Sequence, residues 1–315
     1  MINRDIHKLI KTLQYRLTND PVKRGLYLLN KERPRAFRTG NQIQCKELNL
    51  TLDPDKFLLI LPVYERMIEL RERTGAEFRL ENDVLVAHMS GLNLEVTIAE
   101  DVYILWEIYC NGSYNYQSSA AKPCVVIDIG MNVGFASLFY SLNKSVSKIY
   151  SFEPFLPTYK QALRNIERNK SLSGKIVTHQ FGLGRNEENL VVNYAPHQRG
   201  RVGIYGTSLI RGEVHSTTEE NIEIRKASTV LRDIIQAHGD ESAVEYLAKI
   251  DTEGSEYGIL QDLHEQGILR KLNVVVMEWH EQGPSALLEW LTDSGFNCFH
   301  IDNTVKTGMI YAIRR

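Results

Sequence analysis

The sequence predicts an α/β fold in which a mostly parallel sheet carries helices on both faces, preceded by an N-terminal α+β extension. Three observations lead to this prediction. From residue 124 onward, short apolar β-branched runs alternate with segments of helical periodicity. Two of these runs end in an acidic residue close to Gly or Pro, as strands that lead into ligand-binding turns do. Hydrophobic residues make up 43% of the chain, which is enough for a substantial core.

Seven runs in the C-terminal two-thirds of the chain are predicted to be strands, and the first has the composition of a strand buried on both faces. They are Cys124–Gly130, Ser147–Pro154, Lys175–Gly184, Tyr246–Asp251, Asn273–His280, Asn297–Asp302 and Thr307–Arg315. Helices are predicted between them at 133–142, 157–170, 256–265 and 284–294. We expect the last run to pair antiparallel beside Asn297–Asp302, because only a short connection separates the two.

The N-terminal third has a different pattern. An amphipathic helix is predicted at 2–17, a basic loop with a short helix after it, and a helix within 55–73 that is either interrupted near Pro62 or begins there. Three further runs, Glu77–Leu80, Val84–His88 and Leu92–Thr97, are separated by turn residues and predict a small meander. We therefore place a domain boundary between 1–95 and 96–315, with an insert in the second domain at about 185–245.

Charge and cysteine content exclude several classes of protein. With 37 basic and 39 acidic residues, the chain as a whole is not suited to binding a polyanion, although its first 46 residues are basic. The four cysteines are far apart and form no CxxC pair, so we expect neither a zinc site nor a disulfide framework. No run is long and apolar enough to span a membrane, and a cytoplasmic location is expected.

The turn after the first of the seven strands carries the strongest local signal. It reads Asp128-Ile-Gly130-Met-Asn132-Val-Gly134, at the point where a strand ends and a helix begins. Glycine at such a point allows a ligand to approach the backbone, and the aspartate offers a carboxylate. The spacing is GxNxG and not the GxGxxG that binds a dinucleotide pyrophosphate. The alternative interpretation is a tight strand–helix turn without a ligand.

Acidic residues close three further strands. Glu153 ends the second strand, where a carboxylate can accept both ribose hydroxyls of a nucleoside. Asp251 and Glu253 follow the fourth strand, and Glu278 and His280 end the fifth. Because the ends of neighbouring parallel strands converge, these groups are expected to share one cleft, where a histidine among carboxylates is a candidate base for a hydroxyl proton. Glu256 and Glu281 are interpreted as charges at helix N-termini.

Four segments of the chain resemble the FkbM family of S-adenosylmethionine-dependent methyltransferases. They are VVIDIGMNVGFASLFYS, YSFEP, STVLRDII and KIDTEGSEYGIL, and the resemblance extends from about residue 96 to the C-terminus. It implies a class I methyltransferase fold, S-adenosylmethionine as cofactor, and methyl transfer to a hydroxyl, often on a sugar or a natural product.

The resemblance also implies roles for individual residues. Asp128, Gly130, Asn132 and Gly134 would line the methionine side of the cofactor, and Glu153 would hold the ribose. Gly182 and Leu183 would lie near the adenine. His280, Asp251 and Glu253 are the candidate catalytic residues. Related methyltransferases sometimes recruit a divalent cation, and Asp251, Glu253 and Glu278 could supply oxygen ligands. No dedicated metal motif is visible, however, so we predict no metal site.

Three alternatives remain open at this point. A nicotinamide-dependent oxidoreductase is disfavoured by GxNxG and by the KIDTEGSE strand end. A methyltransferase-like fold kept for binding or scaffolding is disfavoured by the intact glycine and acidic positions. A nucleic-acid methyltransferase is disfavoured by the near-neutral charge and the lack of an NPPY-like base-flipping motif. The predicted partner is a small-molecule or glycan hydroxyl, and a homo-oligomer is left open.

Overall fold

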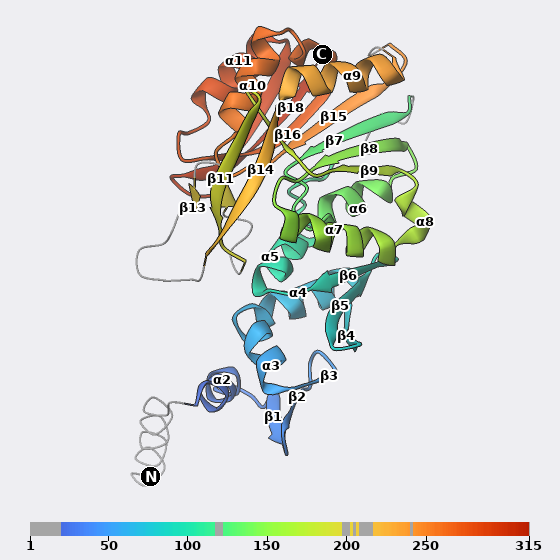
Figure 1. Ribbon diagram of the computed structural model, residues 1–315. Coiled ribbons are helices and arrows are strands. Elements are labelled where there is room, and N and C mark those ends of the chain that lie inside the picture. The colour runs from blue at the N-terminus through green and yellow to red at the C-terminus, as the bar shows by residue number, and fades with distance from the viewer. Residues whose placement is uncertain are drawn as a thin grey trace. The chain divides into compact units, whose positions relative to one another are not determined.

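The computed structural model describes residues 20–116, 122–196, 202–203, 206–207, 217–239 and 242–314 (Figure 1). The chain divides into two compact units, Met1–Asn111 and Gly112–Arg315. The predicted helix at 2–17 lies outside the described residues. Within the predicted insert at about 185–245, residues 197–201, 204–205, 208–216 and 240–241 also lie outside them.

The first unit contains two small antiparallel sheets and a set of helices. Its elements are α2 (Pro21–Leu29), β1 (Ala36–Thr39), β2 (Gln42–Cys45), β3 (Leu50–Leu52), α3 (Pro54–Ile60), a 3₁₀ turn (Leu61–Val63), α4 (Tyr64–Thr74), β4 (Glu77–Glu81), β5 (Val84–Met89), β6 (Leu92–Val96), α5 (Ala99–Trp106) and a π-helical turn (Glu107–Asn111). The strand orders are β1-β2-β3 and β4-β5-β6. Phe57, Met67, Leu85 and Leu105 are among its buried side chains.

Local sequence determines where the helices of this unit begin. The Asp20 and Asp53 side chains accept backbone N–H groups at the starts of α2 and α3, and each helix has a proline in its first turn. Pro62 lies in the 3₁₀ turn that separates α3 from α4, so the predicted interruption is confirmed. The predicted meander is also confirmed as β4–β6. The interpretation of the preceding basic segment as loop and short helix is wrong in part, because it contains β1 and β2.

The second unit is built on a sheet of seven strands, β17-β18-β16-β15-β7-β8-β9. The strands are β7 (Cys124–Ile129), β8 (Val146–Phe152), β9 (Ile176–His179), β15 (Glu245–Ile250), β16 (Val274–His280), β17 (Phe296–Asp302) and β18 (Thr307–Arg314). Within this sheet only β18 runs antiparallel to its neighbours, between β16 and β17. The predicted fold class and the antiparallel pairing of the last strand are therefore confirmed.

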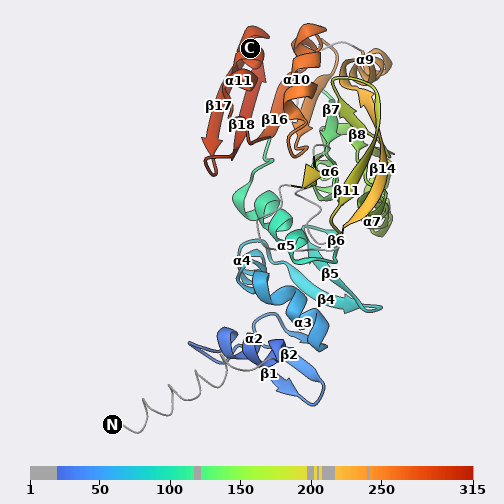
Figure 2. The same ribbon diagram turned by 60° about the vertical axis from the view of Figure 1, so that its left-hand side comes forward.

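Helices cover both faces of this sheet, as Figures 1 and 2 show. They are α6 (Phe135–Ser141), α7 (Leu156–Arg168), α8 (Lys170–Ser173), α9 (Ala227–His238), α10 (Glu256–Glu265) and α11 (Ser285–Asp293). Val125, Ile127 and Ile129 of β7 belong to one buried cluster with side chains of α9, α10 and α11. The intervening Asp128 points to the other face, where Ser137 of α6 hydrogen-bonds to it.

The insert forms a second small sheet next to the central one. Its order is β10-β14-β11, with β10 (Gly182–Gly184), β11 (Glu188–Tyr194) and β14 (Thr218–Lys226), and two short strands, β12 (Val202–Gly203) and β13 (Gly206–Thr207), pair separately. The prediction of one strand over 175–184 is wrong in its extent. Only Ile176–His179 pairs with β8, whereas Gly182–Gly184 leaves the central sheet and pairs with β14 of the insert.

The compact units meet at 111/112, whereas the sequence places the domain boundary at 95/96. The difference is α5 and the π-helical turn, which pack on α4 of the first unit. The boundary at 95/96 stays a prediction. Among the described residues, no helix combines the length and the apolar character that crossing a membrane requires.

Candidate active site

A pocket lies at the carboxyl ends of the central strands, where the order of the sheet reverses. From β7 the chain builds outward through β8 and β9, and it then returns to β15 on the other side of β7. Ligands of open α/β sheets bind at such a switch point. The pocket there encloses about 600 Å³ of empty space, part of it open to solvent, and this size suits a nucleoside-sized ligand. The lining residues are Ile129, Gly130, Asn132, Phe152, Glu153, Pro154, Phe155, Gly182, Leu183, Ile224, Asp251, Thr252, Glu253 and Ser255.

The loop after β7 passes very close to the end of β15. Gly130 has a φ of +82°, and a Cβ atom on it would lie 1.8 Å from the Asp251 carbonyl oxygen. Only glycine therefore fits between these two strand ends. Asn132, two residues further on, also has a positive φ of 51°. Its side-chain Oδ1 is buried and has no hydrogen-bond partner within the described part of the chain, so it is available to a ligand.

Lys249 holds the strand ends together beneath the pocket. Its side chain is 3% exposed, and its Nζ donates to the Gly130 carbonyl oxygen at 2.6 Å. The same Nζ lies 3.4 Å from Asp128 Oδ1 and 3.6 Å from Asp251 Oδ2. Burial alone lowers the pKa of Lys249, but the two carboxylates outweigh it and raise the pKa, so the ammonium group stays charged. Asp128 thus binds Lys249 and Ser137, and it is not among the residues that line the pocket.

Glu153 follows β8, and each oxygen of its carboxylate already accepts one hydrogen bond. Oε2 accepts the Asn132 N–H and Oε1 accepts the Phe155 N–H, each at 3.0 Å. Because a carboxylate offers about four lone-pair sites, each oxygen retains the capacity to accept another hydrogen bond. The side chain is only 5% exposed, and burial raises the pKa of Glu153 to about 7 against the lowering effect of the two backbone bonds.

Apolar groups form the side of the pocket next to Glu153. Gly182 and Leu183 line it, as predicted for the adenine side, together with Phe155 and Ile224. Sequence analysis missed Phe155 and Ile224. The signal for Phe155 is its place directly after Glu153-Pro154. Ile224 lies in the insert, and only the pairing of β14 with β10 brings it to this site.

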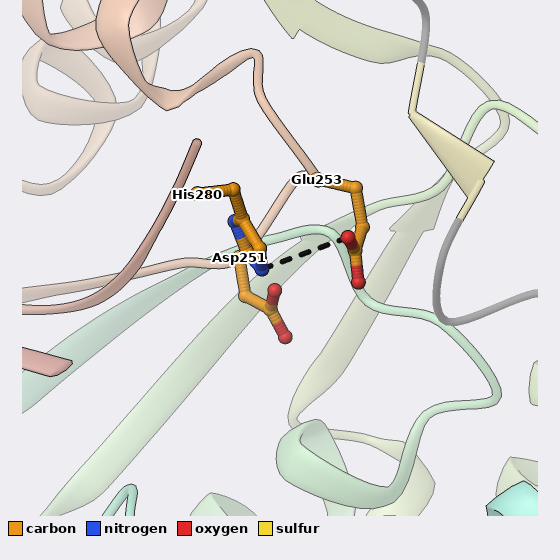
Figure 3. Close-up of side chains that lie close together, drawn as sticks. All are labelled: Asp251, Glu253 and His280. Carbon is orange, nitrogen blue, oxygen red and sulfur yellow. Dashed lines mark ion pairs between the residues drawn. The ribbon is translucent and has the colours of Figure 1, made fainter. Parts of the chain in front are cut away.

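Asp251, Glu253 and His280 converge beyond the end of β15 (Figure 3). One potential ligand atom of each lies within 4.8 Å of the others. His280 Nε2 is 3.6 Å from Glu253 Oε2 and 3.9 Å from Glu278 Oε1, while Nδ1 is 3.1 Å from Glu256 Oε1. The structure thus brings the three predicted catalytic side chains together.

Two further contacts fix this cluster, and sequence analysis missed both. Glu256, interpreted from sequence as a helix N-terminal charge, is fully buried and accepts the His280 N–H at 2.7 Å and the Gly254 N–H at 2.8 Å. The Tyr114 hydroxyl donates to Asp251 Oδ2 at 2.9 Å. Tyr114 lies near the start of the second unit, far from Asp251 in the sequence, so this contact was not foreseen.

The cluster concentrates charge in a partly buried place. Burial lowers the pKa of His280, but its bond to Glu256 and the charges of Glu253 and Asp251 raise it to about 10. Burial and the neighbouring carboxylates raise the pKa of Glu253 to about 8. Burial also raises the pKa of Asp251, but the charges of Lys249 and His280 outweigh this effect, and the pKa is lowered. The shifted pKa values thus favour a charged His280 and an ionised Asp251, and Glu253 is the carboxylate whose pKa is raised.

The predicted site residues fall into two groups. Those that line the pocket are Gly130, Asn132, Glu153, Gly182, Leu183, Asp251 and Glu253. Asp128, Gly134 and His280 are not among the lining residues. Gly134 has a φ of +85° at the start of α6, and His280 lies behind Glu253 at the end of β16. The ligand roles of all these residues remain predictions.

The sheet order, with one antiparallel strand next to its edge and a pocket at the switch point, defines the class I methyltransferase fold. The sequence profile of the methyltransferase FkbM domain matches residues 128–298. The chain belongs to this family of methyltransferases, which confirms the resemblance seen in the sequence.

Two curated proteins and one solved structure are similar to this chain. The chain is 28% identical to "Methyltransferase sdnD" of Sordaria araneosa, over 63% of this chain and 83% of that protein. It is 26% identical to "Methyltransferase 1" of Beauveria bassiana, over 69% of this chain and 87% of that protein. Among solved structures, the methyltransferase FkbM of Methylobacillus flagellatus superposes with a TM-score of 0.40 at 15% identity, covering 80% of this chain and 59% of the other.

Proposed function

We propose that this methyltransferase uses S-adenosylmethionine and transfers the methyl group of this cofactor to a hydroxyl. The first candidate acceptor is a sugar hydroxyl of a glycan, glycolipid or natural product. The observation that carries the proposal is the position of the Asp251–Glu253–His280 cluster at the edge of the switch-point pocket. A hydroxyl must lose its proton to become a good nucleophile, and a cluster of this kind can take it up.

The pocket residues fit the cofactor at three places. The Glu153 carboxylate keeps acceptor capacity for two ribose hydroxyls, and the apolar wall with Phe155 and Ile224 suits a purine ring. The unpartnered Asn132 Oδ1 can accept a hydrogen bond from the amino group of the methionine moiety. When bound, S-adenosylmethionine supplies an activated methyl group, whose bond to sulfur breaks as the bond to the acceptor oxygen forms. The protein's task is then to align the acceptor hydroxyl and to receive its proton.

A calorimetric titration of the full chain with S-adenosylhomocysteine, with NAD run in parallel, tests the cofactor assignment. We expect the homocysteine product to bind and NAD not to bind. Binding of NAD alone would favour an oxidoreductase, and binding of neither would favour a scaffold. Mass analysis of acceptors incubated with S-adenosylmethionine then tests the acceptor class, since a sugar hydroxyl gives a methyl ether and an amine gives a methylamine.

Replacing Glu153 by alanine is expected to weaken S-adenosylhomocysteine binding by about 10- to 100-fold, because hydrogen bonds to a charged group contribute about 1.5–3 kcal/mol. Calorimetric titration measures the loss. Glu167→Ala, on the exposed side of α7 where Glu167 pairs with Lys170, is the matched control and should bind as the wild type does. Unchanged affinity in a folded Glu153→Ala protein would remove Glu153 from the ribose role.

The raised pKa of Glu153, about 7, predicts a pH dependence of cofactor affinity. At pH 8 the group is mostly a carboxylate and accepts both hydroxyls, whereas at pH 6 it is mostly protonated and loses acceptor capacity. Affinity for S-adenosylhomocysteine should therefore fall by up to about tenfold as the pH is lowered from 8 to 6. The Glu153→Ala protein, titrated at the same pH values, should lack this change. A profile that is equally steep in the variant would assign the change to another group.

A further inference from the structure

The spacing of the side-chain atoms in the Asp251–Glu253–His280 cluster is unusual for hydrogen bonding. His280 Nε2 and Glu253 Oε2 are 3.6 Å apart, which is too long for a hydrogen bond. Atoms that bind one divalent cation at about 2.1 Å are separated from one another by about 3.0 Å at right angles and about 4.2 Å when opposed. The atoms of the cluster all lie within 4.8 Å of one another, so small side-chain movements would place them around one ion.

The other ring nitrogen of His280, Nδ1, already has a hydrogen-bond partner. Its Nδ1 lies 3.1 Å from Glu256 Oε1, and Glu256 itself is held by two backbone N–H groups. A cation would take the place of the proton that Nε2 carries in the imidazolium form, while the proton on Nδ1 stays donated to Glu256. Histidines that bind metals generally donate their other ring N–H to a carboxylate or carbonyl in this way.

An independent feature of the pocket also indicates a missing ligand. The Ser255 side chain is 4% exposed and lines the same pocket as Asp251 and Glu253. Its Oγ is buried and has no hydrogen-bond partner within the described ranges of the chain. A buried hydroxyl normally has a partner, and a bound ion with its water molecules or an acceptor oxygen would supply one.

Charge favours a cation at the same place. Glu253 and Glu278 both face His280 Nε2, and Glu256 faces Nδ1. The ammonium group of Lys249 is already shared between Asp128 and Asp251. Among the described residues, the side chains that pair with His280 are thus carboxylates, which are groups that attract a divalent cation.

We propose that Asp251, Glu253 and His280 bind a divalent cation of the Mn²⁺ or Mg²⁺ type. Two carboxylates and one imidazole leave coordination positions open for water and for an acceptor oxygen. This inference rests on the proposed function, because a cation at this place would bind the acceptor hydroxyl and lower its pKa. It revises the expectation from sequence that the chain has no metal site.

Titration of the metal-free full chain with Mn²⁺, followed by electron paramagnetic resonance, tests the proposal. We expect one bound Mn²⁺ per chain, and pulsed spectra that contain the coupling of a directly bound imidazole nitrogen. Glu253→Gln should weaken Mn²⁺ binding at least tenfold. Glu281→Gln, on an exposed residue that pairs with Lys306, is the matched control and should bind Mn²⁺ as the wild type does.

Several outcomes would overturn the cation site. They are the absence of Mn²⁺ binding at millimolar concentration, Mn²⁺ binding without nitrogen coupling in the wild type, or equal affinity in folded Glu253→Gln. The nitrogen coupling is read in the wild type, so the test does not depend on a variant that folds. Titration of metal-free protein with S-adenosylhomocysteine separates the two proposals. Cofactor binding without Mn²⁺ binding removes only the cation site, and the reverse result removes only the cofactor assignment.

Discussion

Replacing His280 by alanine is expected to lower turnover by about 10²- to 10⁴-fold while the affinity for S-adenosylhomocysteine changes less than about twofold. His280 pairs with Glu253 and Glu256, so its loss removes the imidazole and its positive charge from the cluster that is proposed to accept the hydroxyl proton. It is not among the residues that line the cofactor pocket, and for this reason binding should persist.

Steady-state kinetics with an identified acceptor, together with calorimetric titration of the homocysteine product, separates these two effects. His300→Ala is the matched control, because His300 is exposed on β17, outside the cluster. We expect this control to have the turnover and affinity of the wild type. Turnover that survives in His280→Ala would exclude His280 from the chemistry. A parallel loss of cofactor affinity would instead assign it a structural role in the pocket.

The elements of the second unit were largely predictable because their signals are local. The central strands are apolar runs and the segments between them have helical periodicity, so β7, β8, β15 and β16 and the helices α6, α7 and α10 were foreseen. Strands β1 and β2 were missed because they have only four residues each and lie in a charged segment. The split of 175–184 into β9 and β10 depends on pairing with the distant β14, which periodicity does not report.

The site was predictable wherever topology alone brings residues together. The ends of adjacent parallel strands must converge, and this rule placed Asp251 and Glu253 near Glu278 and His280 before any contact was known. Contacts that cross between separate elements were not predictable. Tyr114 reaches Asp251 over a separation of 137 positions, and the burial of Glu256 against His280 results from the packing of α10 on the sheet.

Lys249 illustrates a second limit of sequence reasoning. A lysine inside a predicted buried strand conflicts with the apolar pattern of that strand, and the conflict itself marks a special position. Its partners cannot be read from the strand, however, because Asp128 lies on the neighbouring β7 and Gly130 in the turn that follows. The structure resolves the conflict, since the ammonium group is paired with carboxylates on both strands.

Replacing Lys249 by methionine is therefore expected to destabilise the second unit by about 3–5 kcal/mol, because it leaves Asp128 and Asp251 buried without their cation and frees the Gly130 carbonyl. For a unit of this size such a loss corresponds to a Tm lower by about 10 °C. Denaturant unfolding measures the free energy directly. Lys170→Met, on a lysine with a 75% exposed side chain, is the matched control and should unfold as the wild type does.

The double variant Lys249→Met with Asp128→Asn distinguishes the charge from the packing contribution. If the cost arises from unpaired carboxylates, neutralising the fully buried Asp128 should recover part of the lost stability, although Asp128→Asn alone should destabilise the protein. If the cost arises from the lost packing of the lysine chain, the two losses should simply add. Additive losses would mean that Lys249 acts as a spacer between the strand ends, and the electrostatic account of this part of the site would have to be abandoned.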